Sequence, residues 1–291
     1  MASYRKKYTK SKIGRIKPKK SIFTRLWFWI IVLSLIIVAF AFYFFMFYSG
    51  VQVKNIVIHG NQKVASEDIE NLILENINNK ILSVGSWKID SKSIFLINSE
   101  KLDNQILTNF PVIKDVKIDK KYMQTLVVDI NERIPDAIFC PSLDRAIENE
   151  KGKCYFMDEN GIIFEPLYVM PQNMIIVLQK INDSQVFTGE RVVQQNIMNL
   201  LSKVEKNLKD NFQIDLKEAL ITSPLRLNVN TGENWQIYFD LDPNSDINSQ
   251  LAKLNLLLSG ELSSDNRKNL RYIDLRPKDR AIVCDNKTCG E

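Results

Sequence analysis

The sequence has little of what most enzymes and metal sites need, with one histidine and four cysteines among 291 residues. A single histidine argues against His-rich metal sites and most acid–base triads. Cys-x-x-Cys pairs, phosphate-binding glycine loops and a G-x-S-x-G motif are absent from the sequence. We therefore expect no catalytic residue, no cofactor and no metal site.

Acidic residues are absent from residues 1–26, which hold ten Lys and Arg. The whole chain has 39 basic and 34 acidic residues, so removing this head leaves 29 basic and 34 acidic residues in the body. The net charge is +10 in the head and −5 in the body. Because the body has no basic surplus to neutralise phosphates, we exclude a nucleic-acid partner. Nothing in the composition indicates a small-molecule substrate.

Charge is also absent from residues 27–48, where Ser34 is the only clearly polar residue. A helix of these 22 residues roughly matches the ~30 Å hydrocarbon core of a bilayer. Trp27, Trp29 and Tyr48 lie near its ends, as in an aromatic belt. The run therefore predicts a single transmembrane helix rather than a buried core helix.

The basic head predicts the orientation of that helix. Positive charge stays on the cytoplasmic side, so the N-terminus is expected in the cytoplasm and everything after Gly50 outside it. A cleaved signal peptide would have a shorter apolar region ending in small residues, whereas this run ends in Phe-Met-Phe-Tyr. We predict an uncleaved signal anchor and a single-pass type II protein.

All four cysteines follow the predicted span, where oxidising conditions let disulfides persist. Four cysteines allow three connectivities. Proximity in sequence favours Cys140 with Cys154 and Cys284 with Cys289. A zinc site is the alternative, but the lone His59 is far away in sequence, and four free thiols also stay open.

Residues 51–133 read as one small unit. The expected elements are a strand at 51–58, a helix beginning near Ser66, a polar loop at 78–92, a helix from Asn98 or Ser99 to Phe110, and strands at 112–119 and 125–131. The helices follow from apolar residues at helical spacing, and Pro111 ends the second one. The strands follow from alternating apolar residues, so the order is β-α-α-β-β.

Residues 134–283 are richer in strands. We expect a hairpin within 154–164, a strand at 174–179, a helix at 191–211, a hairpin within 225–241, a helix at 247–262 and a last strand at 270–283. Asn160-Gly161 favours a tight turn in the first hairpin, because this pair accepts positive φ. Both units therefore mix helices with sheets.

Three stretches of the first unit resemble the POTRA domain of the FtsQ/DivIB bacterial cell-division family. They are VKNIVIHGNQKVASEDI at 53–69, NFPVIKDVKI at 109–118 and TLVVDINERIPDA at 125–137. In the second unit YFMDENGIIFEP at 155–166, TGENWQIYFDLD at 231–242, QLAKLNLLL at 250–258 and YIDLRPKDRAIV at 272–283 resemble the family's β domain in order and spacing. The segment 78–92, the Cys140–Cys154 loop and Cys289 depart from the family pattern.

The resemblance implies an α+β chain with five parts. These are a basic cytoplasmic tail at 1–26, a transmembrane signal anchor at 27–48, a POTRA domain at 51–133, a mixed β domain with flanking helices at 134–283, and a C-terminal tail at 284–291. It also implies a location at the division site of the bacterial cell membrane. The implied function is a divisome scaffold that acts by protein–protein interaction and not as an enzyme.

The partners that the resemblance implies are FtsB/DivIC-like and FtsL-like division proteins and, through them, the septal peptidoglycan synthase. In the family the segment after the DLR element pairs with FtsB. The corresponding partner-binding residues here are Asp274, Leu275, Arg276, Asp279, Arg280, Ala281, Ile282 and Val283. A strand edge can bind by adding a partner strand, and the two arginines can bond acidic residues. In the competing interpretation, Leu275, Ile282 and Val283 only fill the core.

A membrane-anchored extracytoplasmic hydrolase of the cell envelope is the alternative function. Asp158 with Glu159, or Asp240 with Asp242, would have to act as acid and base. The first pair is expected at a turn tip and the second at a strand end, where solvated carboxylates are more common. We therefore favour the scaffold.

Overall fold

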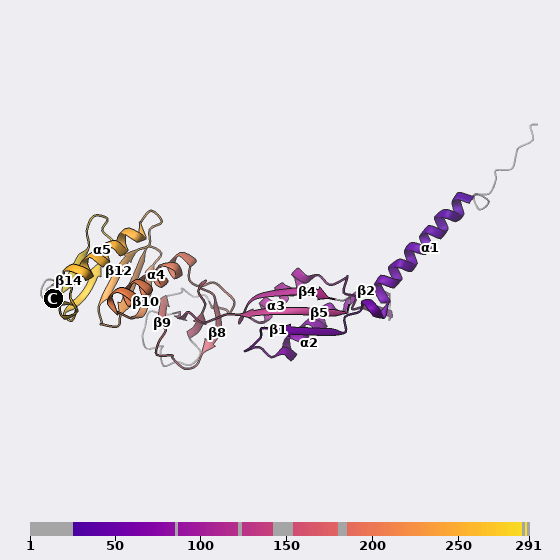
Figure 1. The fold of residues 1–291 in the computed structure, drawn as a ribbon, viewed down its shortest axis with the longest axis horizontal. Coiled ribbons are helices and arrows are strands. Elements are labelled where there is room, and N and C mark those ends of the chain that lie inside the picture. Colours follow the sequence, from indigo (N-terminus) through magenta and orange to yellow (C-terminus); the bar gives the residue numbers. More distant parts are fainter. Residues whose placement is uncertain are drawn as a thin grey trace, which may run out of the picture.

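The computed structural model describes residues 26–84, 87–121, 124–141, 154–179, 185–286 and 289. The basic head and most of the Cys140–Cys154 loop lie outside these residues. Helix α1 (Leu26–Phe47) leads into a small unit, which is followed by a larger one (Figure 1). None of the side chains of α1 is buried, and the helix is long and apolar enough to cross a membrane. The α+β fold with an N-terminal apolar helix is confirmed.

The small unit has a three-stranded sheet in the order β1-β5-β4, in which β1 is parallel to β5 and β4 is antiparallel to it. Its elements are the 3-10 turn η2 (Ser49–Val51), β1 (Asn55–His59), α2 (Ser66–Ile77), β2 (Asn79–Val84), β3 (Trp87–Ser91), α3 (Ser99–Asn109), β4 (Ile113–Lys121) and β5 (Thr125–Glu132). The β-α-α-β-β order is present, with an added hairpin between the two helices.

That hairpin corrects one expectation. The predicted loop at 78–92 is wrong, because β2 and β3 pair there as an antiparallel two-stranded sheet. The pairing gives the backbone groups partners that a loop would leave to water. The first strand also begins later than predicted, because η2 occupies Ser49–Val51 and Gln52 bridges Ser93.

Helices α2 and α3 pack on the three-stranded sheet. Ile69, Ile73 and Ile106 from the helices are fully buried in the same cluster as Leu126 and Val128 of β5. Asn98 caps α3, since its side chain accepts a hydrogen bond from the backbone N–H of Lys101. Local polar residues therefore fix where the helix begins, and apolar spacing fixes which face it buries.

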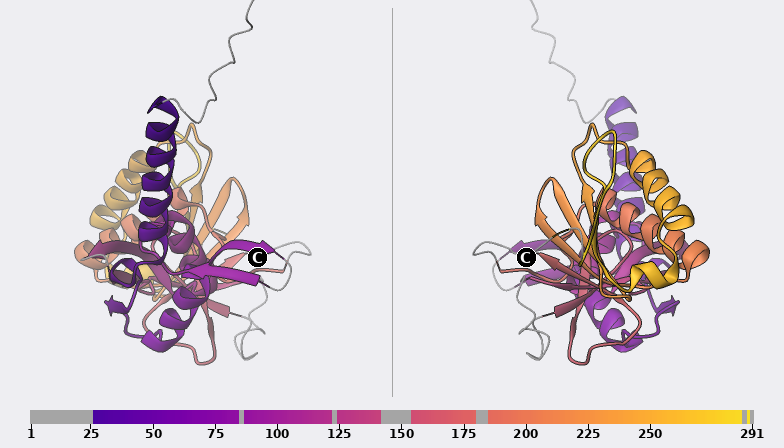
Figure 2. Two further views of the ribbon diagram at one scale, coloured as in Figure 1. Left: turned by 90° about the vertical axis from the view of Figure 1, so that its right-hand side faces the viewer. Right: turned by 90° about the vertical axis from the view of Figure 1, so that its left-hand side faces the viewer.

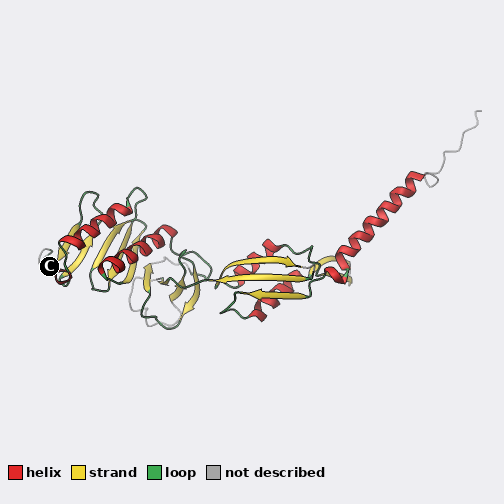
Figure 3. Cartoon of the chain, viewed as in Figure 1, coloured by secondary structure: helices red, strands yellow, loops and turns green. Residues whose placement is uncertain are grey.

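The larger unit has a nine-stranded sheet in the order β14-β13-β12-β11-β10-β9-β6-β7-β8. The strands are β6 (Ala137–Cys140), β7 (Cys154–Met157), β8 (Ile163–Leu167), β9 (Ile175–Gln179), β10 (Leu216–Ser223), β11 (Arg226–Thr231), β12 (Gln236–Asp240), β13 (Leu270–Asp274) and β14 (Ile282–Asp285). The helices are α4 (Gln195–Phe212), α5 (Ile247–Gly260) and α6 (Ser264–Arg267). Figure 3 shows the strands of this sheet in yellow and the helices in red.

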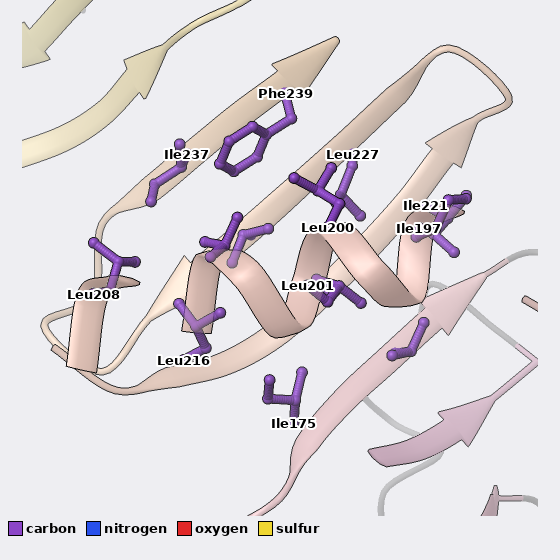
Figure 4. Packing of buried hydrophobic residues seen from close by; sticks show 14 of the residues in the cluster. Ile175, Ile197, Leu200, Leu201, Leu208, Leu216, Ile221, Leu227, Ile237 and Phe239 are labelled. Atoms are coloured by element: carbon purple, nitrogen blue, oxygen red, sulfur yellow. The ribbon is translucent and has the colours of Figure 1, made fainter. Parts of the chain in front are cut away.

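Helices α4 and α5 lie on one side of the sheet, as the end-on views show (Figure 2). Leu200, Leu201 and Leu208 of α4 belong to the same buried cluster as Leu227 and Ile237 of the sheet, and Figure 4 shows Leu200 beside Leu227. A separate, smaller cluster that contains Cys140 and Cys154 is formed near the β8 end. The sheet is therefore covered mainly on its helix side.

Three sequence expectations about this unit need correction. Strands β6 and β10 were not predicted, and the helix expected at 191–211 begins only at Gln195. The single last strand expected at 270–283 is two antiparallel strands, β13 and β14. The chain reverses in the segment between them, which contains Pro277, a residue without a backbone N–H for a ladder.

Candidate partner-binding edge

Strand β14 forms one end of the nine-stranded sheet. It pairs with β13, and no other described strand pairs with it. An edge strand presents a row of backbone N–H and C=O groups that a strand from another chain can use. Two of the residues predicted to bind a partner, Ile282 and Val283, lie on β14, and two more, Arg280 and Ala281, come directly before it.

The backbone direction along β14 follows from two hydrogen bonds. Leu275 N–H donates to the carbonyl of Tyr238 on β12 at 3.0 Å, so the neighbouring Asp274 points its backbone groups toward β14. Asp274 lies opposite Ile282, and Asn286 N–H donates inward to the Asn269 carbonyl at 3.1 Å. Backbone groups alternate in direction along an antiparallel ladder. Ile282 therefore bonds to β13, whereas the N–H and C=O of Val283 face the outer edge.

The side chains of this strand divide between the two faces of the sheet. Val283 and Ala281 are half-buried and pack against the core cluster, while the Ile282 side chain is 40% exposed. Leu275 is fully buried in the core, so its side chain is part of the sheet's packing. The edge thus offers the backbone of Val283 and the side chain of Ile282.

Asp274 and Arg276 form a local ion pair beside the edge. Arg276 donates from Nε to Oδ1 at 2.8 Å and from Nη2 to Oδ2 at 2.6 Å, and its backbone N–H also donates to Oδ1. Burial alone would raise the pKa of the Asp274 carboxyl, but these hydrogen bonds from Arg276 outweigh burial and lower the pKa below its ordinary value. The arginine is therefore oriented by contacts within its own chain.

An aromatic pair supports that arginine on the sheet. Tyr238 and Tyr272 stack with ring centroids 5.0 Å apart. The guanidinium carbons of Arg276 and Arg226 lie 5.6 and 4.6 Å from the Tyr238 ring centroid. Such contacts fix a cation over an aromatic face. Sequence reasoning missed both tyrosines and Arg226, although alternation in 235–241 already indicated that Tyr238 faces away from Ile237 and Phe239.

The segment between β13 and β14 is fixed by a lysine of α5. Lys253 Nζ donates to the carbonyls of Leu275 and Pro277 at 2.9 and 2.6 Å. Asp279 and Arg280, later in this segment, are exposed. Lys253 Nζ also lies 3.5 Å from the carbonyl of Arg280, so this lysine holds the backbone of the connection at both ends and leaves the charged side chains at the surface. No sequence motif singles out Lys253.

The four cysteines are placed in the predicted pairs. Cys140 on β6 and Cys154 on β7 are joined, and Cys284 on β14 is joined to Cys289. Cys284 is a buried residue of β14, and the second disulfide therefore ties Cys289 of the tail to the candidate edge strand. Formation of these bonds in the cell stays a prediction.

The acidic pairs differ in their surroundings. Asp158 is buried and bonds Arg133 Nη1, so the expectation of a solvated turn carboxylate is wrong for this residue. Its other oxygen accepts the N–H groups of Asn160 and Ile162 at 2.9 and 3.0 Å. Asp240 accepts the N–H of Asp242 at 3.1 Å. These contacts give both carboxylates structural roles.

Among the residues that the structure describes, no group of three or more His, Cys, Asp or Glu side chains could hold a metal ion. His59 is exposed at the end of β1.

Comparison with protein families gives two matches. The model for the POTRA domain, FtsQ-type, matches residues 85–133. The model for the C-terminal part of cell division protein FtsQ/DivIB matches residues 146–276. A search of curated proteins gave no match. The second match ends at Arg276, so the candidate edge strand lies just beyond it.

Proposed function

Because the chain belongs to the FtsQ/DivIB family of cell-division proteins, we propose that it is a scaffold that connects membrane-anchored division proteins to septal peptidoglycan synthesis. The family is non-catalytic, and its members assemble division proteins. The family and the apolar α1 together indicate a single-pass membrane protein at the division site. The scaffold acts through protein–protein contacts.

The observation that carries this proposal is the open β14 edge. An FtsB/DivIC-like partner adds a strand along Val283, and an FtsL-like protein joins through that partner. Arg280 and Arg276 attract acidic residues of the incoming segment, because charge-assisted hydrogen bonds are stronger than neutral ones. The Ile282 side chain gives the added strand an apolar contact on the exposed face.

The test substitutes the outward-facing position. Val283→Pro removes an N–H that faces the partner, and it leaves the inward groups of Ile282 and Cys284 to bond β13. We expect pull-down of an FtsB-type partner by the full-length chain in detergent to be lost. Val283→Ala is the matched control, since it trims the same side chain and keeps the N–H.

Two controls make this test decisive. The thermal transition of Val283→Pro must match that of Val283→Ala, which separates docking from unfolding. The exposed Arg280→Glu gives a second variant that does not alter the ladder, and it should weaken binding through charge repulsion. Wild-type binding by Val283→Pro and Arg280→Glu would place the docking surface elsewhere, with the POTRA strands as the next candidate.

The orientation that this function requires is N-terminus in the cytoplasm and both folded units outside. Protease added to spheroplasts should digest the folded units and leave a fragment that contains α1. Protection of the folded units would reverse the proposed topology. The basic head supports the orientation through its charge.

Depletion in cells separates the scaffold from the hydrolase alternative. Loss of the scaffold should give filaments with unfinished septa. Normal septation together with a lost hydrolytic activity would favour the hydrolase instead. No contact among the described residues favours the hydrolase.

A further inference from the structure

The end of α1 is joined to the small unit by polar side chains. Ser93 Oγ donates to the Phe45 carbonyl at 2.8 Å. Gln52 Nε2 and Ser91 Oγ both donate to the Met46 carbonyl, at 2.7 and 2.5 Å. The last carbonyls of a helix lack intrahelical partners, so these three residues satisfy groups that would otherwise need water. The first folded unit therefore begins directly at the end of the apolar helix.

A second contact at the same junction is apolar. Phe95 is 52% exposed, and its ring lies edge-on to that of Phe45 with 5.5 Å between centroids. Phe45 is two residues before the end of α1. Two rings in contact lie at nearly the same depth relative to a membrane that α1 crosses. Phe95 is thus at the level of the last turn of the span, although it lies 50 positions later in the chain.

We propose that Phe95 is immersed in the lipid interface and that the segment 91–95 holds the small unit, which contains the POTRA match, against the extracytoplasmic surface of the membrane that α1 crosses. This inference rests on α1 spanning the membrane. Aromatic side chains favour the headgroup level of a bilayer. The adjacent Lys92 is exposed and can reach anionic headgroups, as basic residues near a membrane surface do.

Lipid is the occupant that the geometry favours. The exposed ring is continuous with the exposed apolar surface of α1, which itself needs a lipid environment. The capping bonds from Ser91 and Ser93 hold this ring against the helix end. A transmembrane segment of another protein is the competing occupant, and the test separates the two.

The experiment uses the full-length chain with the photo-reactive p-benzoylphenylalanine in place of Phe95. The chain is reconstituted in vesicles of phosphatidylethanolamine and phosphatidylglycerol that contain a radiolabelled lipid. Phe40, exposed in the middle of α1, is the positive position, and Leu256 on α5, 77% exposed, is the negative one. We expect lipid adducts at 95 and 40 and none at 256.

Each outcome has a defined meaning. A lipid adduct at 40 but not at 95 overturns the inference and leaves the membrane anchor intact. No adduct at either position overturns the membrane anchor as well. In cells, an adduct at 95 with another protein in place of lipid also overturns the lipid assignment.

A variant tests the seating role of the hydrogen bonds. Ser91→Ala combined with Ser93→Ala frees the carbonyls of Phe45 and Met46 from these side chains. We expect the adduct at 95 to decrease while the adduct at 40 stays unchanged. Equal adducts at 95 with and without the serines would overturn the proposed role of segment 91–95 in seating the unit.

Discussion

The two edge strands of the nine-stranded sheet, β8 and β14, differ in how far the rest of the chain covers their outer sides. At β8, Gly189 N–H donates to the Ile163 carbonyl at 2.6 Å, and Ile163 N–H donates to the Glu190 carbonyl at 3.1 Å. Lys63 of the small unit also bonds Glu165 at 2.5 Å. At β14, no described strand pairs along the outer side, and only the Asp285 carbonyl near its end accepts a hydrogen bond from the tail, from the N–H of Cys289 at 3.3 Å.

The difference shows which edge is available to another chain. Strand edges invite pairing with foreign strands, and proteins block those that should stay unpaired with loops and charges. The segment around Gly189 and the charge of Lys63 block β8, whereas the outward backbone groups of Val283 on β14 pair with no described strand. The covered edge lies beside the first unit, and the open edge lies at the far end of the molecule (Figure 1).

The largest loss of stability is expected for a substitution near the covered β8 edge, where the small unit meets the nine-stranded sheet. Arg133 bonds the buried Asp158 and donates from Nε to the Pro111 carbonyl at 3.0 Å. Arg133→Ala leaves the Asp158 carboxylate buried without its cation, which should cost about 3–5 kcal/mol of unfolding free energy. Urea unfolding of the full-length chain, followed by circular dichroism, measures it.

Lys114→Ala is the matched control, because Lys114 pairs with Glu159 at the surface of the same junction at 2.7 Å. An exposed pair contributes little, because solvent screens its charges and its side chains lose freedom when they pair. Equal losses for Arg133→Ala and Lys114→Ala would show that burial of the Arg133–Asp158 pair does not matter.

The disulfides should differ in their contribution at the two ends. Replacing Cys140 and Cys154 together with alanine opens a longer loop, with 14 positions of separation, and should cost about 3 kcal/mol. The Cys284–Cys289 pair is separated by five positions and should contribute about 2 kcal/mol. Non-reducing peptide mapping tests the pairs themselves, and four free thiols or crossed pairs would refute them.

Gly161, in the turn before β8, tests how closely the segment that follows Gly189 packs against this edge of the sheet. Gly161 has φ +75°, and a Cβ there would lie 2.1 Å from the Val193 carbonyl oxygen. Gly161→Ala should therefore lower the free energy of unfolding by about 1–3 kcal/mol.

The matched control for this glycine is Gly260→Ala at the end of α5, where a Cβ meets no atom within 4 Å. That change should be neutral or raise stability by about 0.5–1 kcal/mol, because alanine favours the helix. Thermal unfolding of both variants measures the difference. If Gly161→Ala left the unfolding temperature unchanged, the backbone around Val193 would have to move away from the β7–β8 turn at no cost.

The smallest effect is expected from Glu233, in the turn that follows β11. Hydrogen bonds from Arg267, at 2.8 and 3.0 Å, lower the pKa of the Glu233 carboxyl against the opposing effect of burial. A lowered folded-state pKa stabilises the fold above the ordinary pKa of glutamate, and this contribution is lost as pH falls through the folded-state value.

Glu233→Gln should remove that part of the acid dependence and cost about 1 kcal/mol at neutral pH, because the amide oxygen can still accept a hydrogen bond from the buried Arg267. Stability measured from pH 7 down to pH 3 should show a shallower decline for this variant. An unchanged pH profile would contradict the assigned pKa shift.

Much of the fold was predictable because it depends on local patterns. The uncharged run at 27–48 corresponds to α1 (Leu26–Phe47), and Asn98 caps α3 as its position before the apolar pattern predicts. The Asn160-Gly161 pair correctly predicted the β7–β8 turn. Length, spacing and turn chemistry are properties of a few neighbouring residues, so the sequence is enough to find them.

The candidate edge was only partly predictable. The pattern at 270–283 indicated strand but not the reversal that makes β14 an edge, because the reversal depends on which strand β13 joins. Backbone direction at Val283 follows from the ladder, and no residue type encodes it. Asp158 likewise reads as a turn residue until Arg133 is brought against it.

The amino-acid sequence by itself determined the apolar span, the basic head, the α+β composition and the ordered motifs of a cell-division family. Tertiary structure decided which sheet edge is covered, which carboxylate is buried and where Phe95 lies relative to the end of α1. The physical reason is the distance along the chain over which each interaction acts, because helix caps, turns and hydrophobic periodicity depend on only a few neighbouring residues. Edges, buried ion pairs and the junction with α1 join residues tens of positions apart, and only folding brings them into contact.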